Sequence, residues 1–191
     1  MKICVYGAAS YEIDESFIIH GEMLGKAMGK RGHSLVFGGG ASGLMGAVAR
    51  GIKDENGYIV GISPNFFNVD GILYDKCDEL IFTDTMRERK QLMEEMSDAF
   101  IVTPGGIGTF EEFFEILTLR SLDRHKKPIA ILNSNGYYDH LVDFLQNGVE
   151  KKFLKEENLD LFFVSNDVER ILDYIENFKQ TDDMKNKTRF V

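Results

Sequence analysis

Short runs of apolar and β-branched residues recur along the chain, and most of them are separated by segments with the periodicity of an amphipathic helix. This alternation constrains the fold more than any other feature, because neighbouring parallel strands need long crossover connections, which helices usually supply. We expect one α/β domain with a doubly wound, mainly parallel sheet, right-handed crossovers and helices on both faces. The expected strands are residues 3–6, 35–37, 58–62, 80–82, 99–102, 128–132 and 161–164.

The length and charge of the chain limit what it can bind. Its 191 residues, 43% apolar and 28% charged, suit one compact domain over residues 1–178, followed by a polar tail over 179–191. A formal net charge of −9 argues against a nucleic-acid or anionic-membrane partner, although one phosphate could still bind in a local basic pocket. No leader-like or membrane-spanning apolar run is present, so we expect a cytoplasmic protein.

The cysteines and histidines show no metal-ligand spacing, and no cofactor motif accompanies them. We therefore expect no metal and no cofactor, and we interpret the two cysteines as free core thiols. The cysteines are Cys4 and Cys77, and the histidines are His20, His33, His125 and His140.

Three glycine-bearing turns follow three of the expected strands: residues 7–10 (GAAS), 38–43 (GGGASG) and 104–109 (PGGIGT). In doubly wound sheets ligands bind beyond the carboxyl ends of the strands, so these turns could together line a crevice. Glycine is also common in such turns for purely conformational reasons. Ser10, Gly39 and Gly40 are candidate nucleotide-binding residues on this reasoning.

The second turn matches the dinucleotide pattern G-x-G-x-x-G and precedes a predicted helix. It follows the second strand instead of the first, however, and Ser63-Pro64 stands where an acid should hold the ribose diol. No Gly-Lys-Ser/Thr sequence follows the glycines, as a P-loop would require. The pattern thus predicts a helix start that can receive a phosphate or ribose, without a full dinucleotide site.

The third turn leads into a helix rich in phenylalanine. Thr109 is placed as an N-cap, which makes Phe110 the first helical residue and Glu112 the N3 residue. Free amide groups and the helix dipole at such a start favour an anion, and the glycines let a phosphate approach. Glu112 can serve a catalytic role or simply complete a capping box with Thr109. Glu111 can be a solvent-facing acid favoured by the same dipole.

Arg89 lies on the apolar face of an expected helix over residues 85–98, together with Met86, Met93 and Met96. Its planar guanidinium suits a phosphate or a carboxylate. The alternative is that its stem packs while its head reaches water or pairs with a nearby acid. Because this helix precedes the fifth strand, Arg89 and Glu112 could face one pocket.

The stretches MRERK (residues 86–90) and PGGIGTFEE (residues 104–112) together resemble the LOG (Lonely Guy) family of cytokinin riboside 5′-monophosphate phosphoribohydrolases. The family pattern is PGGxGTxxE preceded by a helix with Met-His-x-Arg-Lys, and the resemblance extends over about residues 1–175. It implies a Rossmann-like fold, a homodimer or larger assembly with its pocket near the subunit boundary, and hydrolysis of the N-glycosidic bond of a nucleoside 5′-monophosphate. The products would be free base and ribose 5-phosphate, without metal or redox cofactor.

The resemblance also implies residue roles. Arg89 and Glu112 match the catalytic pair of the family, with the carboxylate stabilising an oxocarbenium-like ribose and ordering water. The positions that match the phosphate-holding turn and further substrate contacts are Gly105, Gly106, Gly108, Thr109, Lys90, Glu111 and Thr118. Either the face with Met93 and Met96 or the phenylalanine-rich helix could supply a dimer contact, or both could be core.

The chain departs from the family pattern at Arg87, which stands in the His position, at Leu119, which replaces the usual Trp, and in its first turn. Because of these departures, the sequence does not decide which base is preferred, isopentenyladenine or adenine. The rival function is a non-catalytic nucleotide or molybdenum-cofactor carrier of the same superfamily, which would tolerate loss of the acid. The name lysine decarboxylase, often attached to such sequences, would need a Schiff-base lysine motif, and none is evident.

Overall fold

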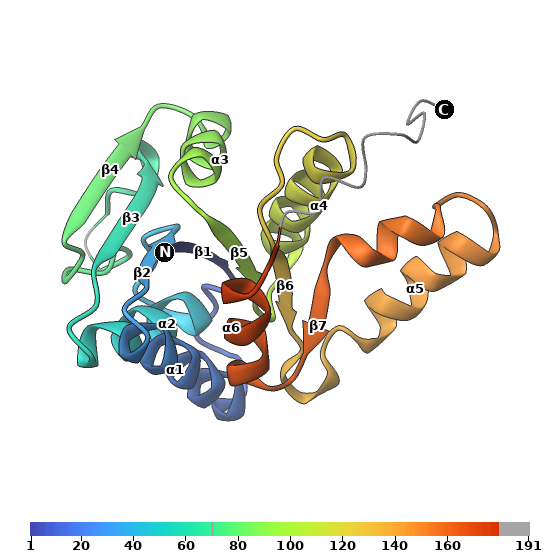
Figure 1. Cartoon of the computed structure of the whole chain (residues 1–191). Coiled ribbons are helices and arrows are strands. Elements are labelled where there is room, and N and C mark those ends of the chain that lie inside the picture. The colour runs from blue at the N-terminus through green and yellow to red at the C-terminus, as the bar shows by residue number, and fades with distance from the viewer. Residues whose placement is uncertain (70, 180–191) are drawn as a thin grey trace.

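A computed structural model of the chain, which describes residues 1–69 and 71–179, shows the expected α/β architecture (Figure 1). Of the predicted polar tail, residues 180–191 lie outside the described residues. The seven strands are β1 (Lys2–Tyr6), β2 (Ser34–Phe37), β3 (Ile59–Pro64), β4 (Glu79–Thr83), β5 (Ala99–Val102), β6 (Ile129–Leu132) and β7 (Phe163–Ser165). The α-helices are α1 (Glu15–Lys30), α2 (Gly43–Asp54), α3 (Met86–Glu95), α4 (Ile107–Ser121), α5 (Asp139–Glu150) and α6 (Val168–Glu176). The described residues also form the short 3₁₀ helices η1 (Asn65–Phe67), η2 (Ser134–Gly136) and η3 (Glu156–Leu161).

The strands form one sheet in the order β4-β3-β2-β1-β5-β6-β7, and every described pairing is parallel. The predicted doubly wound, Rossmann-like class is therefore confirmed. Strands β1 to β4 follow one another from the centre of the sheet to one edge. Strand β5 then pairs with the other side of β1. The strand order thus reverses between β1 and β5, and their carboxyl ends mark the topological switch point at which such sheets bind ligands.

Two apolar layers bury the two faces of the sheet. Helices α1, α2 and α6 cover one face (Figure 1), with Leu24, Val48 and Ile171 fully buried there. On the other face Met93 of α3 and Phe113 of α4 pack in the second cluster. Met93 is fully buried and Met96 packs half-buried against the same cluster, so these two methionines belong to the core.

The prediction for the last strand differs from the structure. This strand begins at Phe163, because Leu161 ends the 3₁₀ helix η3 and Phe162 follows it as an extended cap; both residues are apolar because they pack against the core. Between the parallel strands β3 and β4, the described residues form the 3₁₀ helix η1, and residues 71–78 contain no α-helix. That segment lies against the glycine turn after β2, where Tyr74 N–H donates to the Gly39 carbonyl and Ala41 N–H donates to the Ile72 carbonyl.

Candidate active site

The three glycine turns meet at the carboxyl edge of β1, β2 and β5. The Ala8 amide after β1 donates to the Pro104 carbonyl after β5 at 3.1 Å. The Ala8 carbonyl in turn accepts from the amide of Met45, near the start of α2, at 3.2 Å. These bonds join the segments directly, so the predicted convergence of the turns is present in the structure.

Arg89 and Glu112 form a buried ion pair at this edge. Arg89 comes from the first turns of α3 and Glu112 from α4, and Arg89 Nη1 donates to Glu112 Oε1 at 3.1 Å. Arg89 Nε also donates to the Ile62 carbonyl of β3 at 3.1 Å, which fixes the plane of the guanidinium. Each residue is only 8% exposed, so Arg89 does not reach into bulk water. The sequence alternative of a snorkelling arginine is wrong.

Glycine at position 38 makes room for this guanidinium. A Cβ atom on Gly38 would overlap Arg89 Nη2, so an alanine here would have to displace the head of Arg89. The first glycine of the turn after β2 is therefore explained by close packing against a side chain. This role requires no nucleotide at that position.

Burial sets the proton affinity of Glu112. Removal from water raises the pKa of its carboxyl from 4.5 to about 7, although the neighbouring Arg89 acts in the opposite direction. The carboxyl is thus poised to exchange a proton near neutral pH, which is where a general base works best. Perturbed groups of this kind cluster at functional sites.

The helix after the third turn starts earlier than predicted. Helix α4 begins at Ile107 with Gly106 as N-cap, and no side chain caps it, so Thr109 is the N3 residue. The predicted capping box of Thr109 with Glu112 is therefore wrong, and the Glu112 carboxylate bonds to Arg89 instead. Thr109 is buried, with its hydroxyl packed against the backbone of Gly105.

The start of α4 is open to a ligand. Gly106 and Gly108 are exposed, and the space where a Cβ would sit at either position is empty. Among the described residues, no group accepts a hydrogen bond from the amide of Gly106. Unpaired amides at a helix start, with the positive end of the dipole, form a favourable place for a phosphate.

A second set of charges lies beside the buried pair. Lys90, which follows Arg89 on α3, pairs with Glu111 and, at 2.8 Å, with Glu115 of α4. These ion pairs connect α3 to α4. The two carboxylates balance the positive charge of Lys90, so that charge is not available to a substrate. Thr118 is exposed and lies six residues beyond Glu112, about 9 Å along the helix axis. The structure does not bring it to the buried pair of its own chain.

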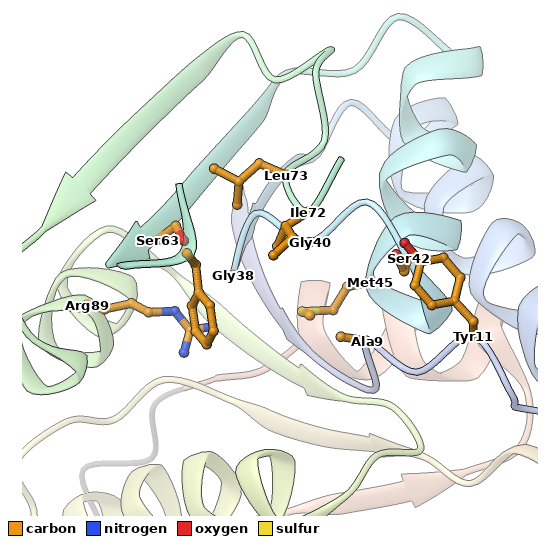
Figure 2. Close-up of a pocket in the computed structure, with 11 residues that line it drawn as sticks. Ala9, Tyr11, Gly38, Gly40, Ser42, Met45, Ser63, Ile72, Leu73 and Arg89 are labelled. Carbon is orange, nitrogen blue, oxygen red and sulfur yellow. The ribbon is translucent and has the colours of Figure 1, made fainter. Parts of the chain in front are cut away.

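A cavity of about 210 Å³ opens beside Arg89 (Figure 2). Gly40 lines it, whereas Ser10 and Gly39 do not; the Ser10 hydroxyl accepts from the Glu12 amide. The wall is mainly apolar and comes partly from the segment after β3, which the sequence analysis did not single out. Its apolar members are Ala9, Tyr11, Met45, Phe67, Ile72 and Leu73. The signal that could have found it is the cluster of apolar residues in a connection with no helical or strand period.

The described residues contain no group of three or more His, Cys, Asp or Glu side chains arranged to hold a metal ion. In the same part of the chain, no helix has the length and apolar character needed to cross a membrane.

Comparison with known proteins places the chain in a family. The family model described as "Possible lysine decarboxylase" matches residues 45–175, which include α3, the third turn and α4. A cytokinin riboside 5′-monophosphate phosphoribohydrolase of Mycobacterium tuberculosis is 38% identical over 89% of this chain and 90% of its own length. The chain belongs to the LOG family.

Other relatives set the limits of the match. The LOG phosphoribohydrolase of Oryza sativa subsp. japonica is 36% identical over 82% of this LOG-family chain, but the match spans only 64% of the rice protein. Among solved structures, the molybdenum cofactor carrier protein of Chlamydomonas reinhardtii superposes with a TM-score of 0.69 at 22% identity, covering 92% of this chain and 95% of the other. That likeness establishes the shared fold alone.

Proposed function

We propose that this LOG-family chain hydrolyses the N-glycosidic bond of a nucleoside 5′-monophosphate, such as a cytokinin riboside 5′-monophosphate or AMP, to free base and ribose 5-phosphate. The observation that carries the proposal is the buried ion pair between Arg89 of α3 and Glu112 of α4, because Glu112 lies on the helix that begins with the open, glycine-rich turn. The first turns of one helix thus offer both an anion site and a carboxylate. The names of the relatives support the same reaction.

In the proposed reaction the C1′–N bond breaks and its electron pair leaves with the base, so that C1′ becomes oxocarbenium-like. The Glu112 carboxylate stabilises this charge and accepts one proton from the attacking water, whose oxygen bonds to C1′. The departing base takes up a proton from solvent. Arg89 holds the carboxylate in place through a charge-assisted bond and favours its ionised form.

The apolar cavity beside Arg89 suits the base, and the glycine turn suits the 5′-phosphate. Gly105, Gly106, Gly108 and Thr109 form that turn in the proposal. The proposal keeps three further substrate contacts, Lys90, Glu111 and Thr118. Their geometry adds no support, because Lys90 and Glu111 are paired with each other and Thr118 lies distant from the buried pair.

The experiment that tests the proposal is chromatography of free base released by the purified protein. The substrates are AMP, isopentenyladenosine monophosphate, GMP and CMP, each with its dephosphorylated nucleoside as control. Release from a monophosphate but not from its nucleoside would support both the reaction and the use of the glycine turn. Absence of release from every monophosphate would refute it, and nucleotide binding without release would favour the carrier function.

The family description also names a lysine decarboxylase, whose pyridoxal phosphate chemistry needs a lysine to form a Schiff base. The described residues that line the cavity include no lysine, and Lys90 is held by two carboxylates on α4. The residues present therefore do not fit that cofactor.

We also propose a cytoplasmic homodimer that uses the outer face of α4. Phe114 is 37% exposed there, and Ile107 at the helix start is 86% exposed, so the helix presents apolar area to a partner. Light scattering on the eluting protein measures its mass. A mass of one chain at micromolar concentration would refute the dimer.

A further inference from the structure

The glycine turn before α4 is held by bonds to its carbonyl groups. The Tyr138 hydroxyl donates to the Thr103 carbonyl at 2.8 Å, and the Ala8 amide donates to the Pro104 carbonyl at 3.1 Å. The Tyr137 hydroxyl donates to the next carbonyl, that of Gly105, at 2.7 Å. Three successive carbonyls are therefore tied to other segments of the fold.

Each tie has a consequence for the amide that follows. A trans peptide group is planar, so its N–H points opposite to its C=O. The bond from Tyr137 to the Gly105 carbonyl therefore directs the Gly106 N–H away from Tyr137. The Gly106 amide belongs to the N-cap of α4 and has no acceptor among the described residues. It is one of the groups that would meet a phosphate at this turn.

The two tyrosines differ in this respect. The peptide group held by Tyr138 joins Thr103 to Pro104, and proline has no N–H. Tyr138 is also almost fully buried, so its hydroxyl satisfies a buried carbonyl. Tyr138 thus anchors the end of β5, whereas Tyr137 sets the direction of an amide.

The backbone of Tyr137 is itself fixed. The Asn133 side chain bonds both to Asp139 and to the Tyr138 amide at 2.7 Å, which closes the segment after β6 around Tyr137. The Tyr137 ring packs edge-on against Phe17 and Tyr138. A phenylalanine at position 137 would keep these ring contacts and lose only the bond to Gly105.

We propose that Tyr137 is a positioning residue for the phosphate-binding turn: its bond to the Gly105 carbonyl aims the Gly106 amide at the 5′-phosphate. The inference rests on the proposed function, because it assumes that the substrate phosphate binds at this turn. Tyr137 itself acts through the backbone and needs no contact with the substrate.

The test compares Tyr137→Phe and Tyr138→Phe with the wild-type protein by calorimetric titration with ribose 5-phosphate and, separately, with adenine. Ribose 5-phosphate engages the turn, whereas adenine reports on the apolar cavity alone. For Tyr137→Phe we expect the Kd of ribose 5-phosphate to rise about five- to tenfold, as for one lost hydrogen bond, while the Kd of adenine and the melting temperature stay unchanged. Tyr137 is 44% exposed, so water can replace the hydroxyl at the Gly105 carbonyl.

Tyr138→Phe is the matched structural variant. It should lower the melting temperature because a buried carbonyl loses its donor, and it should leave the ratio of the two Kd values unchanged. An equal change in both Kd values for Tyr137→Phe, no change in either, or no binding of ribose 5-phosphate by the wild-type protein would overturn the proposal. Base release by the wild-type protein is measured separately, so a failure of the proposed reaction is distinguished from a failure of Tyr137.

Discussion

The substitution Glu112→Gln separates the charge of the buried carboxylate from its shape. Glutamine keeps an oxygen that can accept the bond from Arg89, but it cannot ionise. In the wild-type protein burial raises the pKa of Glu112 from 4.5 to about 7. That rise corresponds to about 3 kcal/mol of free energy that the folded state loses when the carboxyl ionises.

The sign of this effect gives a sharp prediction for stability. Because the folded pKa is raised, the stability that Glu112 contributes is fully present below about pH 4.5 and is lost as pH rises through about 7. Glu112→Gln should match the wild-type melting temperature at pH 4 and exceed it at pH 8. A gain of about 3 kcal/mol corresponds to roughly 6–12 °C for a domain of this size.

The same variant should lose its catalytic activity. We expect base release from AMP to fall on the order of 1,000-fold or more, since no charge remains to stabilise the oxocarbenium-like ribose, while AMP still binds. Melting curves at pH 4 and 8 and chromatography of released base measure the two effects. Glu111→Gln is the matched control for stability, because its carboxylate is exposed and its removal should produce no comparable gain at pH 8. Turnover within tenfold of wild type, or a stability difference that does not widen with pH, would refute the reasoning.

The remaining predictions concern the same pair. The kcat/KM of the wild-type protein should rise with pH through about 7, because burial raises the pKa of Glu112 to that value and the carboxylate is the active form; a pH profile without that step contradicts it. Arg89→Ala should lower kcat/KM at least about 100-fold and move this step to higher pH, because Arg89 lowers the pKa of Glu112; an unmoved profile would show that the pairing is unimportant. Gly38→Ala should lower kcat/KM by about 10- to 100-fold and also lower the melting temperature, because the new methyl group displaces the buried Arg89 guanidinium from its bonds to Ile62 and Glu112. If it acts through Arg89, adding Gly38→Ala to Arg89→Ala should have no further effect, and additive losses would contradict this.

The parallel sheet was predictable because it depends on periodicity, which is a local property of the sequence. The strand order, which places the switch point between β1 and β5, does not follow from periodicity. The last strand was misplaced at Leu161 because an apolar run reports burial, and buried residues also occur in a 3₁₀ helix that packs on the core. The packing of residues 71–78 against the glycine turn after β2 was not predicted. No local sequence pattern indicates that a segment without helix or strand will pack against a turn about 30 residues earlier in the chain.

Part of the candidate site could be predicted from the sequence. Arg89 stands out because a charge in an apolar stripe needs a partner, and the structure supplies Glu112. The capping box failed because the spacing Thr-x-x-Glu is short and occurs by chance, whereas Gly106 begins the helix with no side chain at all. The orienting bond from Tyr137 could not be predicted, since it joins the ends of β5 and β6 through a backbone carbonyl.

The energetics of Glu112 bear on the choice between hydrolase and carrier. A protein that only binds a phosphorylated ligand gains nothing from a buried carboxylate at the same helix start, because the negative charge repels the phosphate and occupies Arg89. Ionising that carboxyl costs about 3 kcal/mol on the scale set by its raised pKa. The cost is offset only if positive charge develops beside it, as it does on the ribose when the base departs. The buried carboxylate therefore favours a reaction over storage, and a carrier would function better with glutamine at position 112.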